Sequence, residues 1–333
     1  MKTITVISGS YRGAPITDTE FPLLAGPKMG AKGEFATVDA SEALGAENSK
    51  IRVQLVDYTV NGETAAALVK KTETDEQVIE RIAERFEILD IMTQGTIDGD
   101  IRAMIVVGPP GVGKSYGVIK KLQESPAAIK AHLTNQPVPF QVIKGAMTAL
   151  GLYVSLYEHQ REGNVLIFDD CDTILQDELS LNLLKAALDT SKVRRIYWNA
   201  DSHKLGNQGI PSSFEFKGSI IFITNIKFDT IRSAKLRDHL GALMSRCHYL
   251  DLTMDTMRDR FLRIRQIADT GELFARHKQA ARDRQEEILT FIYENRDRLN
   301  EMSLRMAVKI GDLVVMNPEK WQALAENTCM KRS

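Results

Sequence analysis

The stretch that decides the fold runs from Ala103 to Ser115 and reads Ala-Met-Ile-Val-Val-Gly-Pro-Pro-Gly-Val-Gly-Lys-Ser. Its apolar start predicts a buried strand over Ala103–Val107. The remainder, Gly108–Ser115, matches the pattern G-x-x-x-x-G-K-S/T at every fixed position. A helix over Ser115–Gln123 is expected to follow. A strand, a glycine-rich loop and a helix in this order are typical of a phosphate-binding loop.

The residue types of this loop suit a polyphosphate. Backbone N–H donors must come close to the phosphates, and Gly111 and Gly113 leave them uncovered. Pro109 and Pro110 have no N–H, so the anion-binding amides are expected from Gly111 onward. The helix N-terminus adds a dipole that favours anions.

The end of the loop carries the more specific chemistry. Lys114 is expected to reach the β- and γ-phosphates of ATP, and Ser115 is expected to ligate Mg²⁺. A chance glycine-rich turn is the alternative, and the flanking strand and helix make it remote. The predicted ATP-binding residues of this segment are Gly108, Pro109, Pro110, Gly111, Val112, Gly113, Lys114, Ser115 and Tyr116.

A second apolar strand, Val165–Phe168, ends in the acidic residues Asp169, Asp170 and Asp172. Carboxylates are the oxygen ligands that Mg²⁺ prefers. Asp169 is therefore predicted to hold the metal, and Asp170 to orient and polarise the attacking water. An acidic helix cap after a core strand is the alternative, and it applies most to Asp172.

Apolar strands alternate with helical segments from residue 75 to about residue 250. Further strands are expected at Phe140–Ile143 and Ile220–Thr224, and a helix at Asp75–Met92. This alternation predicts an α/β fold, with a parallel sheet flanked by helices. Helices alone are expected after residue 252, at 254–268, 284–298, 303–315 and 318–328.

The first 74 residues differ from the rest. Thr3–Ile7 predicts a short strand, and Asn61-Gly62 between Ile51–Tyr58 and Thr64–Val69 predicts a hairpin. Residues 8–50 contain many turn formers and little periodicity, so a small, partly irregular β appendage is expected. The predicted domains are this β-rich appendage (1–74), a P-loop α/β core (75–252) and a C-terminal helical lid (253–333).

Composition is that of a soluble globular protein, with 43% hydrophobic and 26% charged residues in 333. The three cysteines have no CxxC spacing, so neither a disulfide framework nor a zinc site is expected, and a reducing cytoplasm is favoured. No apolar run is long enough for a bilayer, so no membrane association is expected.

Charge is unevenly distributed along the chain. Residues 231–333 carry 19 Lys and Arg against 15 Asp and Glu, whereas residues 1–230 carry 24 against 29. The mildly basic C-terminal part permits contact with nucleic acid. A solvated helical surface explains the same charge.

With its two phosphate-site motifs, the chain resembles the AAA+ ATPase superfamily over about residues 75–315, as a small single module of possible phage or mobile-element type. The family ends its acidic strand in Asp-Glu, and this chain has Asp169-Asp170. The shorter Asp170 bears on the rate of hydrolysis and not on nucleotide binding. Ser219–Asn225 resembles the sensor 1 strand, which implies that Asn225 lies near the γ-phosphate. A strand-ending turn is the alternative.

The resemblance also implies functional arginines. The family places an arginine finger before a strand that matches Tyr249–Leu252, which implies Arg246, with Arg237 as the alternative. Such a finger reaches a neighbouring subunit's nucleotide, so a homo-oligomeric ring, most often a hexamer, is implied. Arg305 resembles sensor 2, in which a lid arginine touches the nucleotide. An ordinary helix-surface arginine is the alternative for each.

Three functions remain open. The first is a DNA-acting motor or loader. The expected location is the cytoplasm, which is the host cytoplasm if the source is viral. In residues 194–217, His203 and Lys204 suit phosphates, and Tyr197 and Trp198 suit base stacking. A sheet extension with core aromatics explains this segment equally well.

The second function is a protein remodeller that docks a protein partner through residues 1–74. Lys144–Met147 lacks the aromatic residue that protein unfoldases of the family carry there, which weakly disfavours polypeptide threading. The third is a P-loop kinase that acts on a small molecule. The long helical C-terminal region and the Asn225 and arginine signals argue against it.

Overall fold

The computed structural model describes residues 3–11, 14–30, 33–44, 50–61, 73–200, 202–226 and 234–331. The chain forms two compact units, Met1–Glu73 and Thr74–Ser333. Within the described part, none of the helices combines the length and the apolarity that a bilayer crossing needs.

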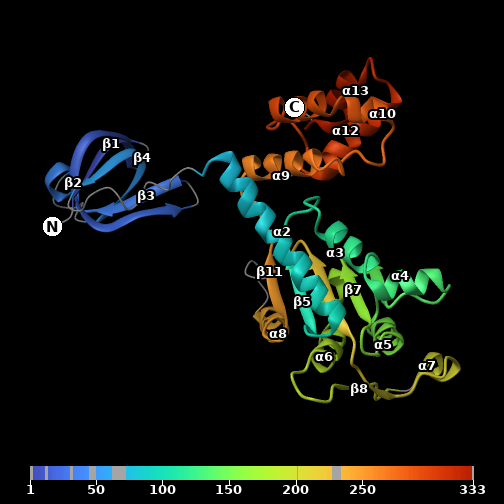
Figure 1. Cartoon of the computed structure of the whole chain (residues 1–333). Helices are drawn as coiled ribbons and strands as arrows, with labels where there is room; N and C mark the ends of the chain where they lie inside the picture. The colour runs from blue at the N-terminus through green and yellow to red at the C-terminus, as the bar shows by residue number, and fades with distance from the viewer. Residues whose placement is uncertain are drawn as a thin grey trace. The chain divides into compact units, whose positions relative to one another are not determined.

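The N-terminal unit is a closed antiparallel barrel of four strands, drawn in blue in Figure 1. They are β1 (Thr3–Tyr11), β2 (Ala14–Gly30), β3 (Gly33–Val38) and β4 (Ile51–Asn61), with a short helix α1 (Ser41–Leu44). β1 pairs with β2 and β4, and β3 pairs with the same two strands. Ile4, Val6, Phe21, Val38 and Val53 fill its core.

The predicted β appendage is confirmed, but its expected irregularity was wrong, because the described residues between 8 and 50 are largely strand. Register shifts interrupt the pairing of β1 with β4 and of β2 with β3. Each shift changes which face a side chain occupies, and this hides the alternating pattern in the sequence. Thr64–Val69, the expected second strand of the hairpin, lies outside the described residues.

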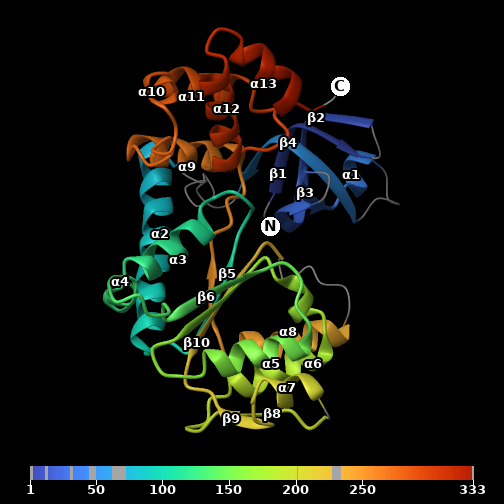
Figure 2. The ribbon, with the colours of Figure 1, turned by 90° about the vertical axis from the view of Figure 1, so that its right-hand side faces the viewer.

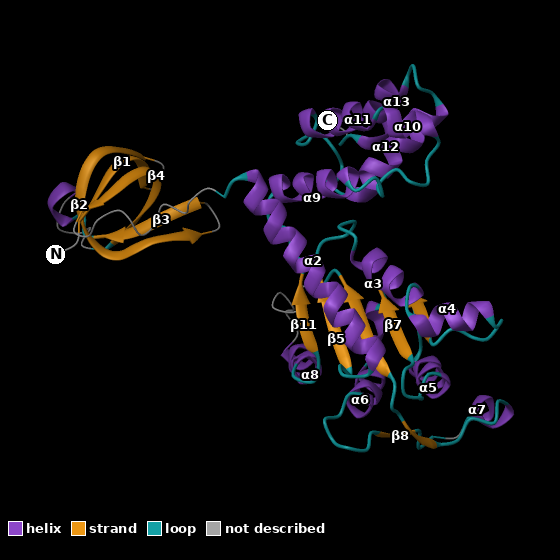
Figure 3. Ribbon diagram, viewed as in Figure 1, coloured by secondary structure: helices purple, strands orange, loops and turns teal. Residues whose placement is uncertain are grey.

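The second unit is built on a five-stranded sheet in the order β11-β5-β10-β7-β6 (Figure 3). All its neighbouring strands are parallel. The strands are β5 (Ala103–Val107), β6 (Phe140–Lys144), β7 (Val165–Asp169), β10 (Ser219–Thr224) and β11 (His248–Asp251). The predicted parallel sheet is confirmed.

Helices cover both faces of this sheet (Figures 1 and 2). Met104 and Val106 of β5 pack toward α2 (Asp75–Asp98) and α3 (Lys114–Gln123). Ile105 and Val107 belong to the opposite core. The helices of that second face are α5 (Ala149–Glu158), α6 (Glu178–Ala187) and α8 (Ala234–Met244). Strands that are buried on both faces explain the continuous apolar runs in the sequence.

The C-terminal helices form a bundle with its own apolar core. They are α9 (Met257–Asp269), α10 (Gln279–Asp283), α11 (Gln285–Glu294), α12 (Leu304–Met316) and α13 (Trp321–Cys329). The expected helical region is confirmed, with α10 as an addition. We call this bundle the lid; its boundary near residue 252 stays a prediction.

Candidate functional site

The loop between β5 and α3 has the conformation that its glycines predict. Gly111 has φ +72° and Gly113 has φ +103°, both in the left-handed region that favours glycine. Gly113 is the N-cap of α3 and offers no side chain to its first amides. The amides at the start of α3 are therefore uncovered, as an anion site requires.

Lys114 is the buried cation of this loop, with only 6% of its surface exposed. Its Nζ donates to the carbonyl oxygens of Gly108 (2.6 Å) and Pro109 (2.9 Å) and to Oδ1 of Asn225 (2.8 Å). Burial lowers the pKa of Lys114 to about 8, and two nearby carboxylates offset part of that shift. Its neutral partners leave the ammonium able to attract a phosphate.

Ser115 and Asp169 form the part of the site that suits a metal. Ser115 Oγ donates to Asp169 Oδ1 at 2.7 Å, and Asp169 is 3% exposed. Described residues provide no group of three or more His, Cys, Asp or Glu able to hold a metal. Mg²⁺ fits this sparse oxygen pair, since it commonly takes one or two protein oxygens and completes its shell with phosphates and water.

Asp170 and Asn225 meet at the ends of two neighbouring strands. Asn225 Nδ2 donates to Asp170 Oδ1 at 2.9 Å, while Asn225 Oδ1 accepts from Lys114. Burial raises the pKa of Asp170, and the charge of Asp169 adds to this rise. Asp172 does not join them, because it accepts from Thr224 Oγ1 at 2.8 Å.

The lid closes against the phosphate-binding loop through the start of α12. Leu304 N donates to Gly111 O at 2.8 Å. A Cβ on Gly111 would lie 2.7 Å from Cβ of Ser303 and 3.5 Å from Cγ of Arg305. Because Gly111 has no side chain, the start of α12 can pack against the loop, and an anion can approach the loop amides. The charge of Arg305 also acts to lower the pKa of Lys114, as expected for a cation close to the loop.

A pocket of about 900 Å³, which we call the lid pocket, lies between the loop, α2, α3 and the lid. Its volume falls within the roughly 300–1,000 Å³ of small-molecule sites. Cationic side chains outnumber acidic ones in its lining, which favours an anionic ligand. The cationic residues are Lys114, Lys120, Lys121, Arg263, Arg276, Arg305 and Lys309, and the acidic ones are Asp90, Glu124, Asp170, Glu272 and Asp312. Ser115 and Tyr116 also line it.

Arg263 of α9 is a lid-pocket residue that the sequence did not reveal. Its guanidinium carbon lies 3.4 Å from the ring centroid of Phe86 on α2, and its Nε donates to Val112 O at 3.4 Å. Nη1 donates to Gln266 Oε1 at 2.6 Å. Burial lowers its pKa to about 10. A buried cation beside the phosphate-binding loop suits nucleotide binding, but in the sequence it is one more helix arginine.

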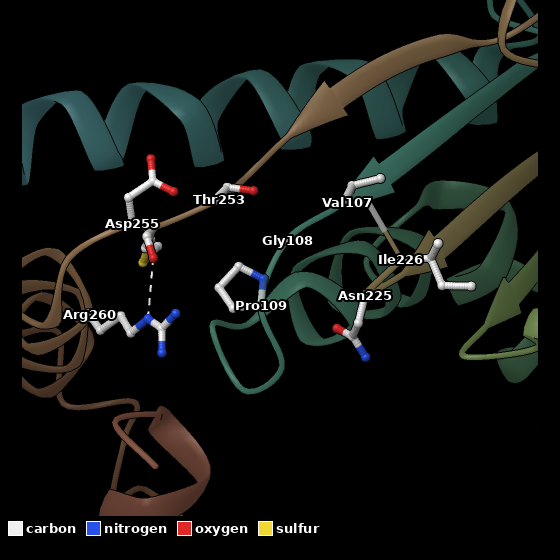
Figure 4. A pocket seen from close by; sticks show the side chains of 9 residues that line it. Val107, Gly108, Pro109, Asn225, Ile226, Thr253, Asp255 and Arg260 are labelled. Carbon is white, nitrogen blue, oxygen red and sulfur yellow. Dashed lines mark hydrogen bonds between the residues drawn. The ribbon is translucent and has the colours of Figure 1, made fainter. Parts of the chain in front are cut away.

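A second pocket of about 530 Å³, the strand-end pocket, is lined by Gly108 and Pro109 of the loop (Figure 4). Asn225 lines this pocket and the lid pocket alike. Arg260 of the lid extends toward it, and its Nε donates to Met254 O at 3.2 Å. Asn225 therefore lies between two cavities, next to Lys114.

The two finger candidates lie away from this chain's own pockets. Arg246 follows α8 and donates from Nη1 to Ala242 O at 2.5 Å. Arg237 is an exposed residue of α8. Neither residue lines the lid pocket or the strand-end pocket. Their assignment as arginine fingers stays a prediction.

The segment before β10 forms a short antiparallel ribbon. β8 (Arg195–Tyr197) pairs with β9 (Ser213–Glu215), and α7 (His203–Asn207) lies between them in the chain. Trp198 packs with Tyr153, at 5.6 Å between ring centroids. Tyr197 is 56% exposed and His203 is exposed. Trp198 is thus half-buried and packs against the core, and Tyr197 and His203 face solvent. The side chain of Lys204 lies outside the described residues.

Comparison with known proteins shows a relative that matches this chain over nearly its whole length. The chain is 32% identical over 336 residues to the uncharacterized 36.7 kDa protein of the nrdC-mobD intergenic region of Enterobacteria phage T4. The match covers 98% of this chain and 97% of that protein. No protein-family model matches.

Solved structures are similar to this chain at a lower level. NtrX from Brucella abortus, crystallised with ATP, has a TM-score of 0.44 and 11% identity, covering 77% of this chain and 53% of NtrX. Domain III of the replication initiation protein DnaA from Thermotoga maritima has a TM-score of 0.42 and 14% identity, covering 75% of this chain and 92% of that domain.

Proposed function

The chain belongs to one family with the phage T4 protein of 36.7 kDa, and we propose that it is an AAA+ ATPase that binds and hydrolyses ATP between its core and lid. The observation that carries this proposal is the meeting of Lys114, Asp169, Asp170 and Asn225 at one edge of the sheet. They come from three separate segments of the chain, and each offers a group that phosphoryl transfer uses.

The described contacts support a distinct role for each residue. The amides at the start of α3 and the Lys114 ammonium bind the phosphates. Ser115 and Asp169 hold Mg²⁺, which neutralises charge on the β- and γ-phosphates. Asp170 orients the attacking water and accepts its proton. Asn225 is hydrogen-bonded to both Lys114 and Asp170 and holds these two side chains in position relative to each other.

The lid contributes Arg305 and Arg263 to the same nucleotide. Leu304 already contacts Gly111 of the loop, so the position of α12 depends on the conformation of that loop. Arg263 joins Val112 to Phe86 of α2 in the same way. Binding and loss of the γ-phosphate are therefore expected to change how the lid packs on the core, which is the movement that remodelling uses.

We also propose that Arg246 completes the site of a neighbouring subunit in a ring, with Arg237 as the alternative. Arg246→Ala is expected to lower kcat roughly 1,000-fold with ATP affinity retained, because the finger acts on charge that develops during transfer. Sedimentation with and without ATP measures assembly, and phosphate release measures kcat. Arg161→Ala, an exposed arginine outside both pockets, is the matched control. A strict monomer with full ATPase activity would rule out the ring.

DNA is the macromolecule that we propose as the substrate of this ATPase. The net positive charge of residues 231–333 and the solvent-facing Tyr197 and His203 support this choice. Single- or double-stranded DNA is expected to stimulate phosphate release at low salt, and the stimulation is expected to disappear as salt rises. If DNA neither stimulates phosphate release nor binds in a salt-sensitive way, the result counts against DNA as the substrate.

Protein remodelling is the second candidate. The barrel supports this candidate, because it forms a compact unit of its own and exposes the apolar side chains of Ile7, Leu24 and Val56 to which a protein partner would bind. A chain that lacks residues 1–73 separates the two functions. Retained DNA stimulation in that chain favours the DNA role, and loss of a captured protein partner favours the remodelling role.

A further inference from the structure

Lys144 is a cation that the site does not need for phosphate binding, yet it lies on the metal carboxylate. It ends β6, and the parallel register of β6 and β7 pairs it with Asp169. Its Nζ lies 2.8 Å from Asp169 Oδ2. The Asp169 side chain is 5% exposed, whereas the Lys144 side chain is 63% exposed. The sheet therefore fixes this pair, with the carboxylate inside and the ammonium reaching in from the surface.

Both oxygens of Asp169 are engaged in this state. Oδ1 accepts from Ser115, and Oδ2 accepts from Lys144. Lys114 makes its own three hydrogen bonds to Gly108, Pro109 and Asn225. In the described residues, the ion pair of Asp169 is with Lys144 alone. A buried carboxylate is stable only with such a partner, so Lys144 is its counter-cation here.

We propose that Lys144 is an internal counter-cation of Asp169 that leaves this carboxylate when Mg²⁺ binds with the nucleotide. This inference rests on the proposed function. Two cations close to one carboxylate repel each other, so Lys144 and the metal oppose each other's binding. The exposed Lys144 ammonium regains water easily, which makes its departure inexpensive. By linkage, Lys144 weakens the dependence of nucleotide binding on Mg²⁺.

Departure of Lys144 also acts on the chain that follows it. Gly145 has φ +86° and begins the connection to α5, whose N-cap is Thr148. Met147 N donates to Thr173 Oγ1 at 3.4 Å within this connection. Lys144 thus connects the carboxylate of Asp169 to the segment that leads to the N-terminus of α5. When Mg²⁺ replaces Lys144 at Asp169, the ion pair that holds the start of residues 145–148 is lost.

The test is the Mg²⁺ dependence of ATP binding in the full chain. The dissociation constant of a slowly hydrolysed ATP analogue is measured with Mg²⁺ and with EDTA. Lys144→Met is expected to raise the ratio of the dissociation constant in EDTA to that in Mg²⁺ about tenfold. Without the ammonium, Asp169 repels metal-free phosphates, and Mg²⁺ no longer competes with Lys144 for this carboxylate. Lys144→Arg keeps a cation and is expected to restore the wild-type ratio. Lys192→Met, an exposed lysine outside both pockets, is the matched control.

A second readout is independent of affinity. The amine of Lys144 is expected to react faster with an acetylating reagent when Mg²⁺ and the analogue are both present, while Lys192 reacts at a constant rate. An unchanged ratio of dissociation constants in Lys144→Met, or unchanged reactivity of Lys144, would overturn the inference. Nucleotide binding by the wild-type chain would still support the proposed function in that case. Failure of the wild-type chain to bind the analogue would overturn both.

Discussion

Asn in place of Asp170 is expected to lower the rate of ATP hydrolysis by roughly 100- to 10,000-fold, because the attacking water then loses its proton acceptor. The backbone at Asp170 has φ +52°, in the left-handed region where Asp and Asn are enriched among non-glycine residues. Asn can adopt this conformation and can still accept from Asn225 Nδ2 through Oδ1. The substitution thus removes a charge with little change in shape.

Phosphate release and ATP binding measured on the same preparation separate the two effects. Affinity for Mg-ATP is expected to stay or to increase, since one negative charge near the phosphates is lost. Release of phosphate without an added acceptor also separates hydrolysis from the kinase alternative. Unchanged turnover in Asp170→Asn would show that another group activates the water. The left-handed conformation also offers a physical reason for Asp at a position where the family has Glu.

Lys114→Ala is expected to weaken ATP binding by roughly 100-fold or more, since each hydrogen bond to a charged group contributes about 1.5–3 kcal/mol. The hydrogen-bond partners of the buried Lys114 ammonium are neutral in the described structure, so its charge is available to the phosphates. The variant removes that charge and leaves the loop glycines in place. The dissociation constant of ATP, measured by calorimetry, gives the effect directly.

Two controls make this result interpretable. Lys130→Ala changes an exposed lysine of α4 (Pro126–Leu133) outside both pockets, and it is expected to bind ATP as the wild-type chain does. Thermal unfolding of Lys114→Ala without nucleotide tests whether the loop still folds. Wild-type affinity in a folded Lys114→Ala chain would contradict the role of this lysine.

Local chemistry explains what the sequence predicted well. The strand–loop–helix order around Gly108–Ser115 and the acidic end of β7 are contiguous in the chain, and each position follows from one physical requirement. Continuous apolar runs in β5 and β10 require helices on both faces, which fixed the fold class. Parallel strands end at one edge of the sheet, so the meeting of Asp170 with Asn225 could be expected from topology alone.

Contacts that join distant elements were beyond reach of the sequence. The stacking of Arg263 on Phe86 depends on how the lid packs against α2. The pairing of Lys144 with Asp169 depends on the register of β6 against β7, and no sequence motif predicts this register. In the barrel, register shifts break the period-two pattern, and so its strands read as turns and irregular chain.

The most direct test of the account is a calorimetric titration of the purified wild-type chain with ATP, in Mg²⁺ and in EDTA. The account predicts saturable binding of one nucleotide per chain that is tighter with Mg²⁺ and is weakened by roughly 100-fold or more in Lys114→Ala. Absence of saturable, magnesium-dependent binding by a folded wild-type chain would contradict it.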